Sequence, residues 1–518
     1  MNEAIAKQRR RWLWFALAIV CLLAIASMAI LRNHSSNSAV KRTTDSLLVV
    51  GIGTEPTTLD WQKHGDPAAE LALWSINEAL IELGPRGEFI PRLAASVPAV
   101  DPDDPERWRV ELRRGVSFTN GEPFNAAAVK ANVDRVTTPD FETVTSGYER
   151  LAGAEVVSEY VVDILTNGPD PVFLFRLPEL RFLPPKAMND PGYAENPVGT
   201  GPYLFDRWDR GNVIVLKKNP DCWDEPGAIA TVEIRFIKDE GTRLSALQTG
   251  EIDLAPIAPD QADRVPQVIR SATAVESGAS RFNLTKAPYS DIRFRQALNY
   301  AIDKEAINNA IFGGFFEVSA CQALPVGAFG FNPDLVAYEY DPEKARDLLA
   351  QVAIPAGFVV EFDGVAEFWI RDREVQEAIA SYWRDIGLDV NLTINTTDSY
   401  LDKLMAGDDS PGIMYMELDH RYFHGARILD RQFNRQGTIA TIGTALPEVD
   451  ALMTETQNFD EAASLDAYHK LFRIGCEKAV SVFTLDRFDI WGAAKDVHYM
   501  PGRGGIHRLD FNRVSFDK

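Results

Sequence analysis

This chain lacks the sequence signatures that most often mark an enzyme. Its 518 residues contain no GxSxG elbow, no phosphate-binding P-loop, no HExxH zinc helix and no GxGxxG after a strand. Each absence excludes one common route to hydrolysis, nucleotide binding or metal-dependent catalysis. The sequence therefore identifies no catalytic residue, and it favours a protein that binds its ligand rather than transforming it.

Histidine is scarce, and one pair has a spacing that is typical of metal sites. An α-helix would place His420 and His424 on the same face. Gly425 and the aromatic residues between the two histidines disfavour a stable helix, and no third ligand stands at a recognisable spacing. We therefore expect neither a metal site nor a cofactor.

Positive charge is in short supply. Lysine and arginine together number 53 against 75 aspartates and glutamates, and the formal net charge is -22 at pH 7. Such a surface repels phosphate backbones, which excludes nucleic acid as a partner. Apolar residues make up 46% of the chain, as in a globular protein, and its length predicts two or three domains.

Cysteine is also rare. Cys21 lies in an apolar N-terminal run, which leaves Cys222, Cys321 and Cys476 for the rest of the chain. An odd number of cysteines permits at most one disulfide among them. Three buried thiols are the simplest interpretation, and a single disulfide is the alternative.

The first 43 residues are expected to lie outside the fold. Basic residues precede an uncharged run from Trp12 to Leu31, the layout of a secretory signal or an N-terminal membrane anchor. The run is long enough to span a bilayer, yet Ala24-Ile25-Ala26 inside it resembles a cleavage site. Both alternatives imply export. The polar stretch Arg32–Thr44 is predicted to be a linker.

The segment from Asn196 to Ala255 has the pattern of a hairpin followed by a parallel βαβ unit. Turn residues separate two β-prone runs, and an alternating run, a short helical run and a further apolar run come next. The expected elements are strands at 203–208, 213–217, 232–236 and 252–254 and a helix at 241–248. The sheet should therefore be at least partly parallel, with a right-handed crossover. Helical spacing recurs over Arg293–Ile311 and Glu374–Ile386, so a second mixed sheet is expected.

Five ordered motifs carry a resemblance to a known family. They are GTEPTTLDW at 53–61, WRVELRRGVSFTNGEPFNAAAVKANVDRV at 108–136, NPVGTGPY with TRLSALQTGEIDLA between 196 and 255, DIRFRQALNYAIDKEAI at 291–307 and YDPEKARDLLAQ at 340–351. The sequence resembles the family 5 extracellular solute-binding proteins, the peptide- and nickel-binding receptors of bacterial ABC importers. The resemblance covers roughly residues 47 to 500.

The resemblance implies an α/β, two-lobe fold like that of periplasmic binding proteins of type II, in the three-domain form of peptide binders. The expected first lobe comprises 44–83, 186–282 and 481–518, with an accessory domain at 84–185, and the second lobe comprises 283–480. The chain should cross between the lobes near Gly278–Asn283 and Val480–Asp486, where ligand would close them by a hinge motion. Cys321 and Cys476 would share a lobe in this layout, which makes them the first choice for a disulfide.

The implied function is capture of a solute outside the cytoplasm. The protein would bind a peptide or related small organic solute between its lobes, as a monomer, and deliver it to ABC transporter permease subunits. It would work in the periplasm or on the outer face of the cytoplasmic membrane, held there if the leader is uncleaved. The alternative is a membrane-anchored extracytoplasmic sensor or chaperone with the same fold, which the long leader favours.

The resemblance places Asp419 at the ligand. Relatives that bind peptides hold the ligand's amino group with an Asp shortly after a strand of the second lobe, and the matching position is Asp419. Dipeptide-binding relatives add an Arg for the carboxylate, whereas Arg371 and Arg373 are displaced from that place here. A longer peptide, an opine or sugar derivative, or another small cation is therefore expected. The alternative for Asp419 is an exposed loop residue paired with Arg421 or Arg427.

Other candidate residues lie around Asp419 or in the loop that leaves the first strand, since open sheets place ligands at strand ends. Aromatic residues near Asp419 would exclude water and strengthen the pairing. The full set of expected ligand-binding residues is Asp419, Trp369, Phe368, Tyr415, Glu417, His420, Glu55, Thr57 and Trp74. Trp74 also has the helical spacing of a core residue.

Overall fold

The computed structural model describes residues 46–84, 87–141, 147–148, 150–225, 227–366, 369–433, 446, 448–499, 501 and 508–517. The expected leader and Phe368 lie outside these residues. Within the described ranges, no helix has both the length and the apolar character that a membrane crossing requires. Residues 46–516 form one compact unit.

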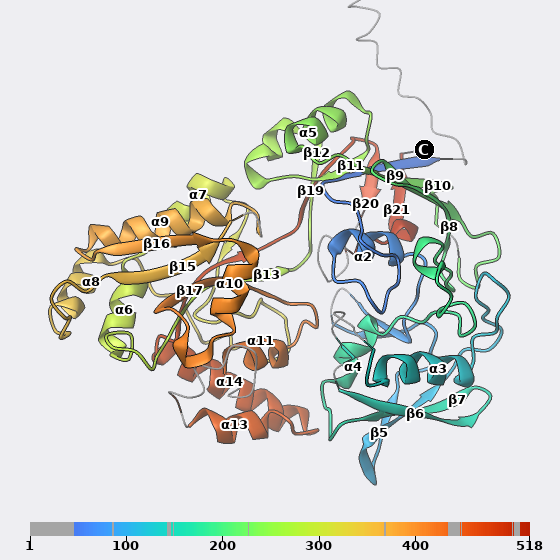
Figure 1. Ribbon diagram of the computed structural model, residues 1–518, viewed down its shortest axis with the longest axis horizontal. Helices are drawn as coiled ribbons and strands as arrows, with labels where there is room; N and C mark the ends of the chain where they lie inside the picture. The colour runs from blue at the N-terminus through green and yellow to red at the C-terminus, as the bar shows by residue number, and fades with distance from the viewer. Residues whose placement is uncertain are drawn as a thin grey trace, which may run out of the picture. The chain divides into compact units, whose positions relative to one another are not determined.

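The first lobe contains a seven-stranded mixed sheet, in the order β12-β19-β11-β1-β10-β9-β8, whose strands lie along the upper side of that lobe in Figure 1. Its strands are β1 (Leu47–Ile52), β8 (Tyr203–Asp209), β9 (Val213–Lys218), β10 (Thr231–Phe236), β11 (Leu254–Pro256), β12 (Gln267–Arg270) and β19 (Ile490–Ala493). β1 runs parallel to both β10 and β11, and helix α5 (Glu240–Thr249) connects those two strands. The predicted hairpin and βαβ unit are confirmed.

Local signals determine both ends of α5. The Asp239 side chain accepts a hydrogen bond from the Thr242 backbone N–H at 2.7 Å, which caps the first turn. Gly250 ends the helix with φ of 76°, a left-handed conformation that favours glycine. The short helix is thereby held between two strands of the same sheet.

A four-stranded sheet, β4-β5-β7-β6, packs beside the first sheet and shares its core. The strands are β4 (Ala99–Asp101), β5 (Asp104–Glu111), β6 (Leu151–Ser158) and β7 (Val161–Thr166). Helix α3 (Ala126–Thr137) packs on β6 and β7 (Figure 1), and its N-cap is Asn125, whose side chain accepts from the Ala128 N–H. The smaller elements are α2 (Pro67–Leu73), β2 (Ile81–Leu83), β3 (Phe89–Pro91), α4 (Phe173–Arg176), η1 (Leu177–Glu179), η2 (Tyr193–Glu195), η3 (Pro259–Arg264), β20 (Val497–Tyr499), η5 (Phe511–Arg513) and β21 (Val514–Phe516).

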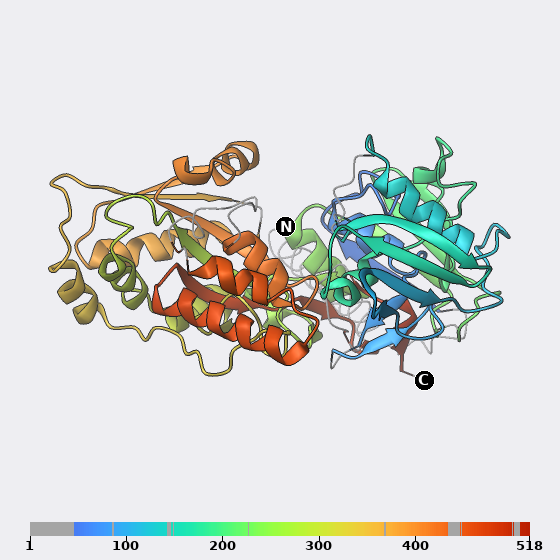
Figure 2. The ribbon, with the colours of Figure 1, turned by 90° about the horizontal axis from the view of Figure 1, so that it is seen from below.

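The second lobe is built on a six-stranded mixed sheet, in the order β14-β18-β13-β17-β15-β16. Its strands are β13 (Glu276–Phe282), β14 (Glu317–Val318), β15 (Val360–Val365), β16 (Val390–Asn395), β17 (Ile413–Asp419) and β18 (Ser481–Arg487). The helical segments are α6 (Ile292–Tyr300), α7 (Lys304–Phe312), α8 (Pro342–Leu349), α9 (Asp372–Asp385), α10 (Thr397–Leu404), η4 (Gly407–Asp409), α11 (Gly425–Gln432), α13 (Val449–Glu455) and α14 (Glu461–Glu477). α13 and α14, in orange-red, lie side by side in Figure 2.

The helix expected over Arg293–Ile311 is two helices in the structure. α6 ends at Tyr300, and α7 begins at Lys304. The Asp303 side chain accepts from the Ala306 N–H at 2.9 Å, so a new N-cap starts a second helix while the apolar spacing continues. Apolar periodicity alone does not reveal such an interruption.

The lobe boundaries differ from those expected. β13 and β18 hydrogen-bond to each other and to other strands of the second sheet, so 276–282 and 481–487 belong to the second lobe. The chain therefore crosses at 271–275 and at 488–489, just outside the stretches predicted from the sequence. The two crossings run side by side, because the Ser271 N–H donates to the Asp489 carbonyl at 2.9 Å.

A disulfide joins Cys321, in the loop after β14, to Cys476 near the end of α14. This is the pair that the family's layout favoured, and the interpretation of three buried thiols is wrong. Cys222 is free and half-buried. The bond closes a loop across 155 residues within the second lobe.

Candidate ligand-binding site

The second lobe meets the first at the end of β17. Asp419 is the last residue of β17 and lies opposite Glu276, the first residue of β13. Both therefore stand next to a chain crossing. The loop that follows carries Arg421, whose side chain contacts the first lobe, and leads into helix α11 (Gly425–Gln432).

Two arginines of α11 hold the Asp419 carboxylate. Arg427 donates from Nε to Oδ1 at 2.5 Å and from Nη2 to Oδ2 at 2.8 Å, and Arg431 places Nη1 2.9 Å from Oδ2. Burial alone would raise the pKa of Asp419, but Arg427, Arg431 and Arg421 outweigh it and hold that pKa well below its usual value. Asp419 thus pairs with Arg427, as in the alternative to ligand binding that the sequence left open. Both of its carboxylate oxygens have protein partners.

Arg421 reaches across to two glutamates of the first lobe. Its Nη2 lies 3.5 Å from Glu70 Oε2 in α2, and its Nη1 lies 3.3 Å from Glu179 Oε2 in η1. Arg508, from the C-terminal segment, holds the other oxygen of each glutamate, at 3.0 Å from Nε to Glu70 Oε1 and through Nη2 to Glu179. Glu70 and Glu179 thus each contact two arginines, Arg421 of the second lobe and Arg508 of the first.

Trp74 supports this ion-pair group from the first lobe. The Arg181 guanidinium lies 3.4 Å from the Trp74 ring centroid and that of Arg508 lies 5.1 Å away. Arg181 is almost fully buried, and burial lowers the pKa of its guanidinium to about 10. Trp74 therefore lies against Arg508, whose glutamate partners also contact Arg421 of the second lobe.

Tyr415 and Glu417 point into a second, fully buried group. The Tyr415 hydroxyl donates to Glu417 Oε1 at 2.8 Å, and Arg487 pairs with the same oxygen at 2.5 Å. Burial and the neighbouring Glu417 raise the pKa of Glu276 well above its usual value, which favours the neutral form of this carboxyl. Trp369 lies edge-on to Tyr415, with ring centroids 6.1 Å apart.

The two histidines near Asp419 have separate structural partners. His420 Nε2 lies 2.9 Å from Ser277 Oγ, which donates to Asp486 Oδ1 at 2.5 Å. His424 caps α11 by accepting from the Ala426 N–H. Burial lowers the pKa of each histidine to about 3, so both are neutral. Among the described side chains, no group of three or more His, Cys, Asp or Glu could hold a metal.

Glu55 and Thr57 are bonded within the first lobe. Glu55 Oε1 accepts from Trp208 Nε1 at 2.9 Å and from the Gly211 N–H at 3.0 Å, and Thr57 donates to Asp66. The structure thus brings Asp419, Glu417, Tyr415, His420 and Trp369 to one end of the second sheet. Trp74 is linked to them only indirectly, because Arg508 beside it shares Glu70 and Glu179 with Arg421, whereas the bonds described for Glu55 and Thr57 lead elsewhere.

Several residues of this region have no clear signal in the sequence. Glu70 and Arg508 are 438 residues apart and meet only through folding. Arg427 and Arg431 have the spacing of neighbours on one helix face, which was a usable signal once α11 was recognised. Glu179 and Arg181 follow a short apolar helix and show no pattern at all.

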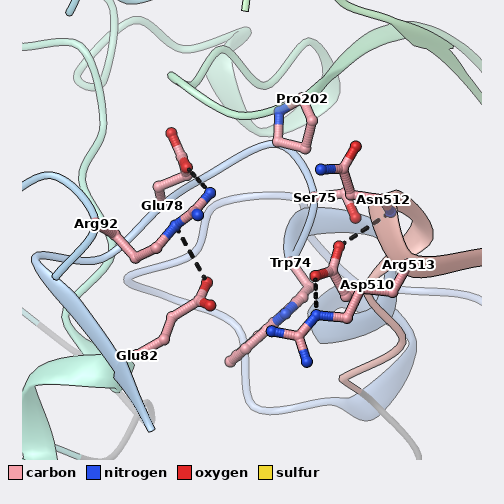
Figure 3. Close-up of a pocket in the computed structure, with 9 residues that line it drawn as sticks. All are labelled: Trp74, Ser75, Glu78, Glu82, Arg92, Pro202, Asp510, Asn512 and Arg513. Carbon is pink, nitrogen blue, oxygen red and sulfur yellow. Dashed lines mark hydrogen bonds and ion pairs between the residues drawn. The ribbon is translucent and has the colours of Figure 1, made fainter. Parts of the chain in front are cut away.

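A cavity of about 100 Å³ lies in the first lobe, behind Trp74 (Figure 3). The charged side chains of its lining are already paired. Glu78 bonds Arg92, Thr200 and Trp223, and Arg513 pairs with Asp510. The remaining lining residues are Ser75, Glu82, Pro202 and Asn512. The cavity does not include Asp419 or its arginines.

Comparisons with known proteins place this geometry among binding proteins. The family model for bacterial extracellular solute-binding proteins, family 5 (middle region), matches residues 88–415. The glutathione-binding protein GsiB of Salmonella choleraesuis (strain SC-B67) is 32% identical over 330 residues, which covers 60% of this chain and 62% of that protein. The chain thus matches only part of the length of this relative.

Solved structures agree in fold. NikA from Brucella suis, in complex with Fe(III)-EDTA, matches with a TM-score of 0.81 and 22% identity over 91% of this chain and 100% of that one. DppA from Helicobacter pylori, in complex with the peptide STSA, matches with a TM-score of 0.74 and 22% identity over 91% and 98%. The predicted two-lobe α/β fold of periplasmic binding proteins is confirmed.

Proposed function

The chain belongs to the family 5 bacterial extracellular solute-binding proteins, and we propose that it is the substrate-binding component of an ABC importer. It would capture a peptide or a related small organic solute between its lobes and deliver it to a membrane permease. The observation that carries this proposal is the family match over 88–415, which covers most of both lobes up to the start of β17.

The arrangement of the lobes supports capture of a solute between them. Two short crossings side by side form a natural hinge, and polar and aromatic residues of both lobes stand next to it. Asp419, Trp369, Tyr415 and Trp74 are the described residues that we propose for the ligand-facing surface. The names of relatives, among them a glutathione-binding protein and a structure with the peptide STSA, favour a peptide-like solute.

The remaining parts of the proposal concern setting and partners. We expect the protein to act as a monomer in the periplasm or on the outer face of the cytoplasmic membrane, with binding and no chemical conversion of the solute. The permease subunits of the importer would be its protein partners.

Native mass spectrometry of the full chain, purified gently from its host, tests the function. We expect a small organic molecule to be bound and to be released on denaturation. Calorimetry with the released molecule should then give saturable binding at one site. A chain that carries no solute and also binds none from a mixed peptide library contradicts the proposal.

A further inference from the structure

We propose that the ligand carries an acidic group, a carboxylate in the case of a peptide, which contacts Arg427 and Arg431 beside Asp419. This inference rests on the proposed function and names the chemical class of its ligand. It also reverses the role expected for Asp419, which would position two arginines instead of binding an amino group itself.

The charges around Asp419 do not balance. Among the side chains that the structure describes there, the three arginines Arg421, Arg427 and Arg431 surround the Asp419 carboxylate, and these four groups sum to a net charge of +2. The nearby acids of β13 and β17 do not offset it. Burial raises the pKa of Glu276 and so favours its neutral form, and the charge of Glu417 is matched by Arg487. His420 is neutral, so it leaves the excess unchanged.

The facing group of the first lobe does not supply the missing negative charge. Glu70 and Glu179 are matched there by Arg508 and Arg181, so the four side chains sum to zero. Arg421 of the second lobe also contacts these two glutamates, at 3.5 Å from Glu70 and 3.3 Å from Glu179. Both distances are longer than the 3.0 Å between Arg508 and Glu70. The positive excess therefore stays with the second lobe.

The two arginines on α11 are reachable. The side chain of Arg431 is 34% exposed and that of Arg427 is 15% exposed, and Arg431 uses a single nitrogen on Asp419. A guanidinium has five N–H donors in a fork that suits a carboxylate. Asp419 fixes the positions of both guanidinium groups and leaves N–H donors of each for a carboxylate of the ligand.

An amino group at the same place would meet repulsion. Both Asp419 oxygens already contact arginines, so an ammonium that bonds either oxygen would lie next to Arg427 or Arg431 and would be repelled by it. A ligand acid gains attraction from the same arrangement without breaking a bond. The charges thus favour an anionic ligand over the small cation that the sequence left open.

Matched peptides test this inference. The full chain is immobilised and offered a random tetrapeptide library in two forms, with a free carboxylate or with a C-terminal amide, and retained peptides are counted by mass spectrometry. A lost charge-assisted pairing weakens binding about ten- to a hundred-fold, so we expect the free acids to be enriched about tenfold or more over the amides. Equal retention, or a preference for amides, overturns the inference and leaves the proposed function intact. Retention of neither form contradicts both.

A substitution tests whether the preference for free acids arises at Arg427 and Arg431. We expect Arg431→Gln to reduce the enrichment of free acids to about twofold or less, because it removes the more exposed cation of the pair. Arg473→Gln is the matched control, since it removes the same charge from an exposed pair with Asp334 on the same lobe. An enrichment that survives Arg431→Gln in a variant with an unchanged melting temperature overturns the assignment to these arginines.

Discussion

Arg421 of the second lobe donates a hydrogen bond from Nη1 to Oε2 of Glu179 in the first lobe, at 3.3 Å. The glutamate is fully buried, and its other oxygen is held by Arg508 of its own lobe. The contact therefore joins the long Arg421 side chain to a carboxylate that Arg508 already holds in place. It offers a direct way to measure how the lobes are held together.

Replacing Arg421 by Gln should open the ligand-free protein. The variant loses its ion pairs to Glu70 and Glu179, so the closed arrangement loses a cross-lobe attraction while each lobe keeps its own core. Small-angle scattering should give a larger radius of gyration for Arg421→Gln than for wild type. Arg473→Gln, whose ion pair with Asp334 lies within the second lobe, is the control. Superimposable scattering curves for all three proteins would show that Arg421 does not hold the lobes.

The disulfide should stabilise the second lobe. Cys321→Ser with Cys476→Ser removes the cross-link over 155 residues, and we expect the free energy of unfolding to fall by about 2 to 5 kcal/mol. Cys222→Ser changes a half-buried free thiol and should have a much smaller effect. Urea unfolding of the three proteins provides the measurement. Equal losses for the double variant and for Cys222→Ser contradict the prediction.

Asp489, in the crossing between β18 and β19, should make stability depend on pH. Burial, with Glu70 nearby, raises the pKa of Asp489 to about 8. The native state therefore holds this proton more tightly than the unfolded chain, where the pKa is about 3.9. Its contribution to stability is complete below the unfolded pKa and is lost as the pH rises through about 8.

Asp489→Asn should therefore gain stability relative to wild type as the pH rises from about 5 to about 8, at up to about 1.4 kcal/mol per pH unit. Urea unfolding at both pH values measures the difference. Asp334→Asn, which alters a side chain that is 74% exposed, is the control. A difference between Asp489→Asn and wild type that does not change with pH would rule out a raised pKa at this position.

Asp419→Asn should destabilise the second lobe in a salt-dependent way. The substitution leaves Arg421, Arg427 and Arg431 without their shared counter-charge, and we expect a loss of about 1 to 3 kcal/mol at low salt. Because the arginines are partly exposed, about 1 M salt should remove much of the difference. Thermal or urea unfolding at two salt concentrations decides the matter. A loss that is the same at low and high salt would point to packing instead of charge.

Local sequence patterns were enough for much of the secondary structure. Asp239 and Gly250 mark the two ends of α5, and Asn125 marks the start of α3, because a cap acts on backbone groups a few residues away. The hairpin β8–β9 and the βαβ unit follow from turn chemistry and apolar spacing in the same way. The family's ordered motifs added the two-lobe fold.

Patterns within a strand do not say which sheet it joins. Apolar alternation predicts a strand whichever neighbours it has, and for this reason β13 and β18 were expected near the lobe boundary but belong to the second sheet. The break between α6 and α7 was missed for a related reason, since the apolar spacing continues across Asp303. Pairing partners come from the whole fold, which the spacing of side chains does not encode by itself.

The site shows the same division most clearly. The sequence by itself showed the resemblance to a solute receptor, and that resemblance placed Asp419 shortly after a strand of the second lobe. Only the tertiary structure decided the partners of that carboxylate, and with them the sign of the surrounding charge. The reason is physical: the electrostatic environment of Asp419 depends on side chains from α11, while that of Glu70 depends on Arg508, 438 residues away. Charge interactions act through space, and only the fold brings these groups within reach of one another.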